Sequence, residues 1–350
     1  MFSVTNERGF VPQSEQFEGR DMVGDDIKAY KIIQSQEFAY NPARINVGSI
    51  AMYSGKVPCM ISSLYVCFKT TQKVDDEWLM QLLKTAKLNY CYNVNGEGGV
   101  RVYLFYPNFA RIRVSLPSLT EQKKIACFLN LLDERISTQN KIIDKLQSLI
   151  KGINQYVFTN NGVIYKLGEL CEIRSGYSGN QLSSKKGLKV SRIETISGHK
   201  VNMERIGYVA PFDPSENYRL RIGDILFSNI NSVEYIGNTA FIDKDYDLYH
   251  GMNLLRLSPN DKVVMPFYLY LLLNTNRMLN HFKTICNKAV SQASINQTEL
   301  GKIVIQLPDI NAQKQICELY QLLYAKLESV IYTNTLFQSQ KQYLLRQMFI

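Results

Sequence analysis

Two long stretches of the chain repeat their apolar residues in alternating steps of four and three. In the first stretch the repeating positions are Ile125, Leu129, Leu132, Ile136, Gln139, Ile143, Leu146, Ile150, Ile153 and Val157, of which only Gln139 is polar. In the second they are Ile316, Tyr320, Leu323, Leu327, Val330, Asn334, Phe337, Lys341, Leu344 and Met348, with polar breaks at Asn334 and Lys341. This heptad spacing predicts two long helices, each with one apolar seam.

Each predicted helix also has a start signal. Ser118 and Glu121 have the spacing of a capping box, and Asn311 is a candidate cap for the second helix. Roughly 40 residues at about 1.5 Å each give a rod of about 60 Å. An apolar stripe of that length either covers its own domain or pairs with another helix. Two matched stripes of equal length favour pairing with each other.

The two stretches are copies of one another. "LPSLTEQKKIACFLNLLDERI" begins at Leu116 and "LPDINAQKQICELYQLLYAKL" begins at Leu307, and they align without a gap at an offset of 191 residues (307 − 116). Earlier segments also correspond: "YKIIQSQEFAYN" at Tyr30 resembles "YRLRIGDILFSN" at Tyr218. The chain therefore reads as two similar modules, each followed by a long helix.

The modules themselves predict a mixed α/β (α+β) fold. Alternating and β-branched stretches set among Gly, Asn and Ser predict strands at 63–68, 101–106, 189–193 and 302–307, with a few short helices between. We expect a first globular domain at 1–115, a first spacer helix at 116–159, a second domain at 160–306 and a second spacer helix at 307–350. If the helices pair antiparallel about a pseudo-twofold axis, Gln139 comes within reach of Asn334, and a hydrogen bond between their amides would fix the register.

Length and composition agree with this division. A chain of 350 residues predicts about two domains, and 45% hydrophobic residues suffice for folded cores. The longest apolar run, Met265 to Leu273, is too short to cross a bilayer, and the first residues lack the pattern of a signal peptide. We expect a cytoplasmic protein.

Cysteine usage and charge narrow the chemistry further. The seven cysteines form no CxxC pair and the three histidines have no paired ligand spacing, so we expect reduced thiols and no metal site. A net charge of +9 and a pI near 9.0 permit a polyanionic partner such as nucleic acid or a membrane surface. The membrane option is less favoured because neither long helix has a Trp/Phe-rich face flanked by Lys and Arg.

Motifs for catalysis are missing from the sequence. A methyltransferase acting on a flipped base needs a Gly-rich cofactor loop and an (Asp/Asn)-Pro-Pro-aromatic clamp; the nearest match, from Asn41 to Arg44, lacks the second proline and the aromatic residue. A Walker-type phosphate loop is also missing, and no clustered carboxylates suggest a metal-dependent nuclease. We therefore expect a non-catalytic chain.

Polar and basic residues that could read DNA gather in several predicted loops. A DNA reader needs Lys and Arg for phosphates beside polar side chains that can pair with base edges. The same residue types form ordinary surface turns, which is the alternative for any single one. The candidates in the second module are Arg174, Ser175, Tyr177, Asn180, Lys185, Ser228, Asn229, Asn231, Ser232, Ser291 and Gln292; those in the first are Tyr40, Asn41, Arg44, Asn46, Ser62, Ser63, Tyr65 and Arg101.

The order of module, Leu-Pro-x-x-x-x-Gln-Lys helix, module and second Leu-Pro helix resembles the specificity subunits of Type I restriction-modification systems. The resemblance covers essentially the whole chain and is strongest in "IRVSLPSLTEQKKIACFL", "IVIQLPDINAQKQICELY", "LGELCEIRSGYSG", "RIGDILFSN" and "SINQTELGKIVIQLP". It implies two target recognition domains that each read half of a split DNA site, held apart by two antiparallel helices.

The resemblance also implies partners. Methyltransferase (modification) subunits and restriction/translocase subunits would carry the chemistry, with S-adenosylmethionine, ATP and magnesium bound to them and no cofactor on this chain. One departure stands out: about 25 residues between Tyr165 and Val190 have no equivalent in the first half, so we expect a shortened first recognition domain. The alternatives are a helical protein-interaction scaffold, or a shortened, inactive specificity subunit that pairs with another.

Overall fold

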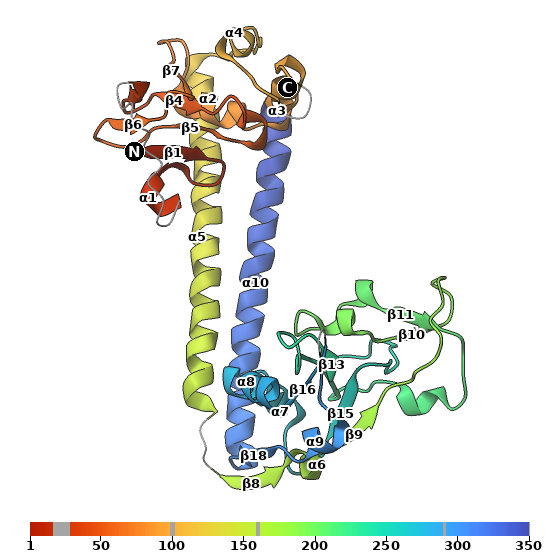
Figure 1. Ribbon diagram of the computed structural model, residues 1–350. Helices are drawn as coiled ribbons and strands as arrows, with labels where there is room; N and C mark the ends of the chain where they lie inside the picture. The colour runs from red at the N-terminus through yellow and green to blue at the C-terminus, as the bar shows by residue number, and fades with distance from the viewer. Residues whose placement is uncertain (17–28, 99–101, 159–161, 290–291, 350) are drawn as a thin grey trace. The chain divides into compact units, whose positions relative to one another are not determined.

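The computed structural model describes residues 1–350 except 17–28, 99–101, 159–161, 290–291 and 350. The chain divides into two compact units. Unit 1 comprises Met1–Ile142 and Val330–Ile350, and unit 2 comprises Ile143–Ser329. Each unit therefore contains one globular module and part of each long helix (Figure 1).

Two helices of 39 residues each carry the heptad seams. They are α5 (Leu119–Val157) and α10 (Ile310–Met348), as the spacing of apolar residues predicts. Ser118 Oγ accepts the Glu121 N–H at the start of α5, over 3.3 Å. The expected cap at Asn311 is wrong: α10 begins one residue earlier, and the Asp309 carboxylate accepts the N–H groups of Asn311 and Ala312, each at 3.0 Å. In the part of the chain that the structure describes, no helix is long and apolar enough to span a membrane.

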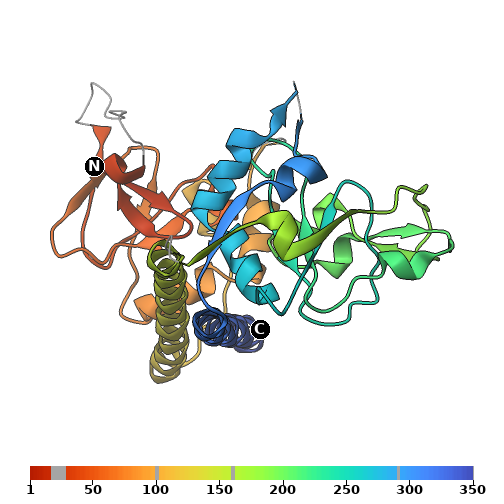
Figure 2. The same cartoon turned by 90° about the horizontal axis from the view of Figure 1, so that it is seen from below.

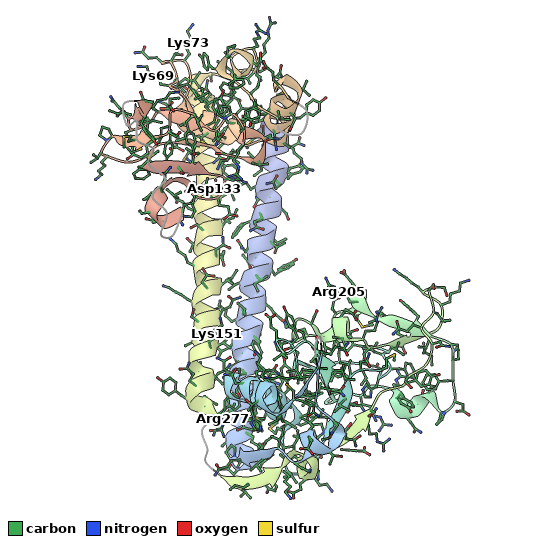
Figure 3. The ribbon with its side chains drawn as sticks, in the orientation of Figure 1. Lys69, Lys73, Asp133, Lys151, Arg205 and Arg277 are labelled. Atoms are coloured by element: carbon green, nitrogen blue, oxygen red, sulfur yellow. The ribbon has the colours of Figure 1, made fainter. Side chains whose placement is uncertain are left out.

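The two helices run antiparallel within each unit. In unit 1 Lys341 Nζ donates to Asp133 at 2.6 Å and Asn334 Nδ2 donates to Asn140 Oδ1 at 2.8 Å. One heptad forward on α5 thus corresponds to one heptad backward on α10. In unit 2 Tyr320 bonds Asn154, two heptads further in the same register. Figures 1 and 2 show α5 and α10 side by side, and Figure 3 labels Asp133 on α5.

The described part of unit 1 contains two small sheets and four short α-helices beside its part of the helix pair. A four-stranded sheet has the order β2-β1-β6-β3 and a three-stranded sheet has the order β5-β4-β7. Trp78, Leu82 and Leu129 lie in the main core, between the three-stranded sheet and α5. The elements are β1 (Phe2–Thr5), β2 (Gly9–Pro12), α1 (Gln13–Gln16), β3 (Lys31–Ile33), β4 (Phe38–Tyr40), a 3-10 turn (Ile45–Val47), β5 (Ile50–Met52), β6 (Cys59–Ile61), β7 (Val66–Phe68), α2 (Asp76–Leu83), α3 (Ala86–Asn95) and α4 (Tyr106–Phe109).

Unit 2 is built around a four-stranded antiparallel sheet with the order β14-β12-β15-β9. Its core joins this sheet to α7, α8 and the adjoining parts of the long helices. The elements are β8 (Val163–Lys166), α6 (Leu167–Leu170), β9 (Cys171–Ser175), β10 (Leu188–Val190), 3-10 turns (Ile193–Ile196, Met203–Arg205, Ser215–Tyr218), β11 (Gly207–Val209), β12 (Ile225–Phe227), β13 (Ile230–Asn231), β14 (Thr239–Phe241), β15 (Leu255–Pro259), α7 (Pro266–Leu273), α8 (Asn276–Ile285), β16 (Asn287–Lys288), β17 (Ala293–Ser294), α9 (Gln297–Gly301) and β18 (Val304–Leu307).

The two modules repeat one sheet order, which confirms the mixed fold class and the internal repeat. The strands β5-β4-β7 of unit 1 correspond to β14-β12-β15 of unit 2. The strand predicted at 302–307 is β18, and that at 63–68 shortens to β7. The strand predicted at 189–193 ends at Val190, because Ile193 starts a 3-10 turn. The strand predicted at 101–106 is wrong where it is described: Tyr103 forms one isolated bridge with Glu97, and Tyr106 starts α4.

Candidate nucleic-acid interface

In unit 2, the loops that carry most candidate residues leave the same end of the central sheet. Ser175, the last residue of β9, pairs with Leu255. Leu255 pairs in turn with Phe227, the last residue of β12, and Phe227 pairs with Thr239. The segments that follow Ser175 and Phe227 therefore start from one row of the sheet. Residues more than 50 positions apart in sequence are brought to one edge, which is what a loop-based reading surface requires.

A second, smaller sheet joins the third candidate loop to this edge. Strand β13 follows directly after Asn229, and its residues Ile230 and Asn231 pair with Ser294 and Ala293 of β17. Strand β17 pairs on its other side with β16, closing a hairpin in which Ala289 N–H donates to the Gln292 carbonyl at 2.8 Å. The exposed Gln292 thus lies on a hairpin that is hydrogen-bonded to the Ser228–Ser232 segment.

The candidate residues of the first loop, after β9, differ in their contacts and in their exposure. Arg174 forms an exposed ion pair with Glu172 at 2.6 Å. Tyr177 is half-buried and stacks on Phe212, with ring centroids 3.6 Å apart and planes 3° from parallel. Ser175, Asn180 and Lys185 are exposed. This loop therefore combines one ordered aromatic pair with exposed polar and basic side chains beside it.

In the second loop one candidate is wrong. Ser228 is fully buried, and its Oγ accepts a hydrogen bond from Asn231 Nδ2 at 3.0 Å, so it braces the loop and cannot reach a base edge. It is the residue directly after β12, where the chain has not yet left the sheet. Ser232 is exposed, whereas Asn229 and Asn231 are half-buried. The Asn231 Oδ1 accepts the Ser232 N–H at 2.8 Å.

A hollow beside these loops is lined partly by residues that the sequence did not identify as candidates. It is lined by Arg174, Ser175, Asn217, His250, Arg256 and Gln297, among others. Arg256 is only 7% exposed, and its Nη1 donates to the Arg219 carbonyl at 3.1 Å. Burial lowers the pKa of Arg256. The position of Arg256 follows only from the strand register, which sets it opposite Arg174 on the neighbouring strand. Both residues line the same hollow.

Unit 1 gathers its candidates in a similar way. Tyr40 at the end of β4 pairs with Val66 at the start of β7, so the segment after β4 and the turn before β7 share one end of the sheet. Arg44 and Ser63 are exposed there, and Ser62 is half-buried. Asn41 Oδ1 accepts the Ala43 N–H at 3.0 Å, which makes a local turn. Asn46 Nδ2 donates to Asn93 Oδ1 at 3.1 Å.

Two candidates of unit 1 are wrong because their side chains are buried. Tyr40 is 0% exposed and packs against Phe68 and Phe109, where burial raises the pKa of its hydroxyl. Tyr65 is 8% exposed, and its hydroxyl accepts the Val4 N–H at 3.2 Å. The two aromatic rings lie in two separate hydrophobic cores of unit 1 instead of facing solvent.

The expected pair of amides in the helix seam is also corrected. Asn334 does form a polar layer, but its partner is Asn140 and not Gln139. Asp133, Asn140 and Asn154 are spaced by whole heptads, and each lies one position after a seam residue of α5. The polar members of the α10 seam therefore meet the flank of the α5 seam.

Two further candidates, Arg101 and Ser291, lie outside the described residues. The candidate DNA residues that remain exposed or half-buried stay predictions. Across the described ranges, no group of three or more His, Cys, Asp or Glu side chains is placed to hold a metal ion. The seven cysteines are free thiols, and four of them are buried.

Family comparison decides the class of protein. The family model of the Type I restriction modification DNA specificity domain matches residues 26–148 and again residues 161–334. The chain belongs to this family. The two matches agree with the internal repeat, because each covers one globular module with part of the long helix that follows it.

Relatives of the specificity-domain family cover different shares of the chain. A protein of Methanocaldococcus jannaschii, assigned to the type I restriction enzyme MjaX as its specificity subunit, is 46% identical over 150 residues, which is 42% of this chain and 35% of that protein. The MjaVIII specificity subunit of the same organism is 27% identical over 303 residues, 78% of this chain and 68% of its own length. The EcoKI specificity subunit of Escherichia coli K12 is 24% identical, over 64% of this chain and 53% of that protein. The chain thus matches about a third to two thirds of the length of these relatives.

Solved structures of the same class share the fold. The S subunit of a Type I restriction-modification system from M. genitalium aligns with a TM-score of 0.62 at 14% identity, covering 91% of this chain and 84% of that one. A chain from a study of complex assembly and conformational transition in the type I R-M system aligns with a TM-score of 0.58 at 20% identity, covering 91% of this chain and 83% of that one.

Proposed function

We propose that this chain is a DNA-reading specificity subunit of a Type I restriction-modification complex. In this role each globular module reads one half of a two-part duplex site through the loops at one end of its central sheet. The observation that carries the proposal is the convergence of the loops after Ser175, Phe227 and Tyr40 on such sheet ends, in a chain of the specificity-domain family. A helical scaffold would have no need of it.

The chemistry would belong to partners. The chain would bind methyltransferase subunits and, through the assembled complex, restriction and translocase subunits in the cytoplasm. S-adenosylmethionine, ATP and magnesium would bind to those partners. The sequence lacks a Gly-rich cofactor loop and a Walker motif, which supports the proposal that this subunit is not an enzyme.

Salt dependence of DNA binding tests the proposal directly. Each phosphate contact releases counterions, so the logarithm of the binding constant of the full chain should fall linearly with the logarithm of salt concentration. Lys185→Met removes an exposed cation of the first loop and should reduce the slope by about one. Lys326→Met, an exposed lysine of α10 in the same unit, is the matched control and should leave the slope unchanged. A salt-independent affinity, or equal slopes for the two variants, would argue against reading by these loops.

A further inference from the structure

The glutamine of the repeated Leu-Pro-x-x-x-x-Gln-Lys motif is buried in both copies and makes three hydrogen bonds in each. In unit 1 Gln122 is 1% exposed. Its Oε1 accepts the Asp75 N–H at 2.8 Å, and its Nε2 donates to the carbonyls of Pro117 at 2.9 Å and Lys73 at 3.2 Å. The side-chain amide of Gln122 on α5 thus joins the segment just before α5 to the segment that leads into α2.

Unit 2 repeats this network with different neighbours. Gln313 is 1% exposed; its Oε1 accepts the Met265 N–H at 2.9 Å. Its Nε2 donates to the Pro308 carbonyl at 2.9 Å and to the Val263 carbonyl at 3.4 Å. The partner residues differ in the two units, since Asp75 is acidic and Met265 is apolar. The bonds are preserved because they use the backbone of the partner segment.

The backbone N–H groups that donate to the two glutamines belong to the N-cap residues of domain helices. Asp75 is the N-cap residue of α2 and Met265 is the N-cap residue of α7. In a capping box, a Glu or Gln three residues into the same helix would bond the N-cap N–H. Those positions hold Trp78 and Tyr268, so here the long helix supplies the missing acceptor.

These domain helices pack on the sheets that carry the candidate reading loops. Helix α7 packs on β14 and β15, the two strands that flank β12, and α2 packs on β5 next to β4. The glutamine is therefore a polar link between the long helix and the short helix that packs on the loop-bearing sheet. It lies beside the apolar core contacts of each unit and, in unit 1, beside the hydrogen bonds from Gln81 of α2 to Asn130 and Asp133 of α5.

We propose that Gln122 and Gln313 are positioning residues that fix the orientation of each reading domain on its long helix, and so determine the spacer length accepted between the two half-sites. This inference rests on the proposed function. It assigns no contact with DNA to either glutamine: each acts through α2 or α7. Replacing the amide removes its three hydrogen bonds, two of them to the segment that leads into α2 or α7, and leaves the apolar core contacts, which are not directional. The domain can then rock on the helix and accept half-sites at neighbouring distances.

The test uses the full chain assembled with its methyltransferase subunit. A plasmid library carries the wild-type methylated motif with its spacer shortened by one base pair, unchanged, or lengthened by one base pair. The variants are Gln122→Met and Gln313→Met, which keep the side-chain volume and remove all three bonds. Gln147→Met and Gln321→Met change exposed glutamines of α5 and α10 and serve as matched controls.

The measured quantity is the ratio of methylation at the original spacer to methylation at the altered spacers. This ratio does not depend on how much folded complex is present, so simple destabilisation leaves it unchanged. We expect it to fall at least about tenfold in each Met variant, with both half-site sequences intact, and to stay at the wild-type value in the controls. Gln122→Glu and Gln313→Glu keep the acceptor for the N-cap N–H and should give a smaller fall.

Each other result has a definite meaning. A ratio within about twofold of wild type in both Met variants would overturn the positioning role. If a Met variant methylates no site, amide hydrogen exchange decides: faster exchange confined to the start of α2 or α7 supports the role, and loss of protection throughout that unit overturns it in favour of a general contribution to folding. If the wild-type complex itself methylates no two-part motif, the proposed function fails first.

Discussion

Two buried tyrosines of unit 1 differ in a single hydrogen bond. Tyr92 donates its hydroxyl to the Leu83 carbonyl at 2.8 Å. The hydroxyl of Tyr40, in the same core, is buried without a hydrogen-bond partner among the described residues. A buried polar group left without a partner costs about 1–3 kcal/mol, whereas a satisfied one contributes about 1 kcal/mol.

The two tyrosines should therefore respond to phenylalanine with opposite signs. Tyr40→Phe should leave the stability unchanged or raise it by about 1 kcal/mol, and Tyr92→Phe should lower it by about 1 kcal/mol. Chemical denaturation of the two variants beside the wild type measures both. A clear loss of stability in Tyr40→Phe would show that its hydroxyl is bonded after all.

His250 links the stability of unit 2 to pH. It is 1% exposed, its Nε2 lies 3.0 Å from the Leu254 carbonyl oxygen, and burial lowers its pKa to about 4. Above pH 6.5 the histidine is neutral in both folded and unfolded chains and has no effect. Between pH 6.5 and about 4 the unfolded chain takes up a proton that the folded chain refuses, so stability falls as the pH falls.

The lowered pKa of His250 predicts that the free energy of unfolding falls by about 2 kcal/mol between pH 7 and pH 5, at about 1.36 kcal/mol per pH unit. His250→Gln removes the titrating group, so the difference in unfolding free energy between wild type and variant should shift by that amount over this range. Parallel pH curves for the two proteins would contradict the account.

At this scale the sequence predicts residue types better than residue exposure. Arg44, Lys185 and Ser232 are exposed as expected, because basic and small polar residues in turns rarely find a buried partner. The burial of Tyr40 and Ser228 could not be predicted, since Tyr40 is the last residue of β4 and Ser228 is the first residue after β12. At a strand end, a shift of one position decides between core and loop. Arg256 could not be found at all without the pairing of β15 with β9.

Among the elements, the long helices were the most predictable. A heptad seam sustained over nine or more positions fixes both the helical state and the face that is buried. The partner of each seam position was less predictable, because a helix turns about 100° per residue and a neighbour one position away can reach the same polar group. For this reason the predicted partner of Asn334, Gln139, is wrong by one position, and the observed partner is Asn140. The network of Gln122 also could not be predicted, since two of its three partners are the backbone groups of Asp75 and Lys73, 47 and 49 residues away.

If the helix pair sets the distance between the half-sites, its length should determine the spacer. Seven residues added to α5 and to α10 beside the Asn140–Asn334 pair lengthen each helix by about 10.5 Å and keep the seam nearly in phase. We expect a spacer longer by roughly three base pairs at about 3.4 Å each, with both half-site sequences unchanged. Sequencing of the methylated motif measures it.

Insertions of four residues are the matched control for this prediction. They rotate the seam by about 40° and should damage helix pairing instead of shifting the spacer. An unchanged spacer after the heptad insertion, or altered half-sites, would show that the helices do not set the distance.

For the whole molecule, the internal repeat is the feature that most constrains function. The same sheet order, the same glutamine network and the same helix length occur twice in one chain. Two similar reading modules on one chain suit a target with two separated parts. The residues between Tyr165 and Val190 that have no equivalent in the first half include β9 and the loop after it. The unit 1 sheet β5-β4-β7 has three described strands, whereas its counterpart in unit 2, β14-β12-β15-β9, has four.

The role that we propose for this chain is to select the DNA sites on which a methyltransferase partner acts. The most direct measurement is the set of methylated sequences produced by the methyltransferase subunit with the chain, without it, and by the chain alone. We expect one two-part motif that is methylated only when the methyltransferase subunit and this chain are both present. Methylation of the same motif without the chain, methylation by the chain alone, or methylation with no two-part motif would contradict it.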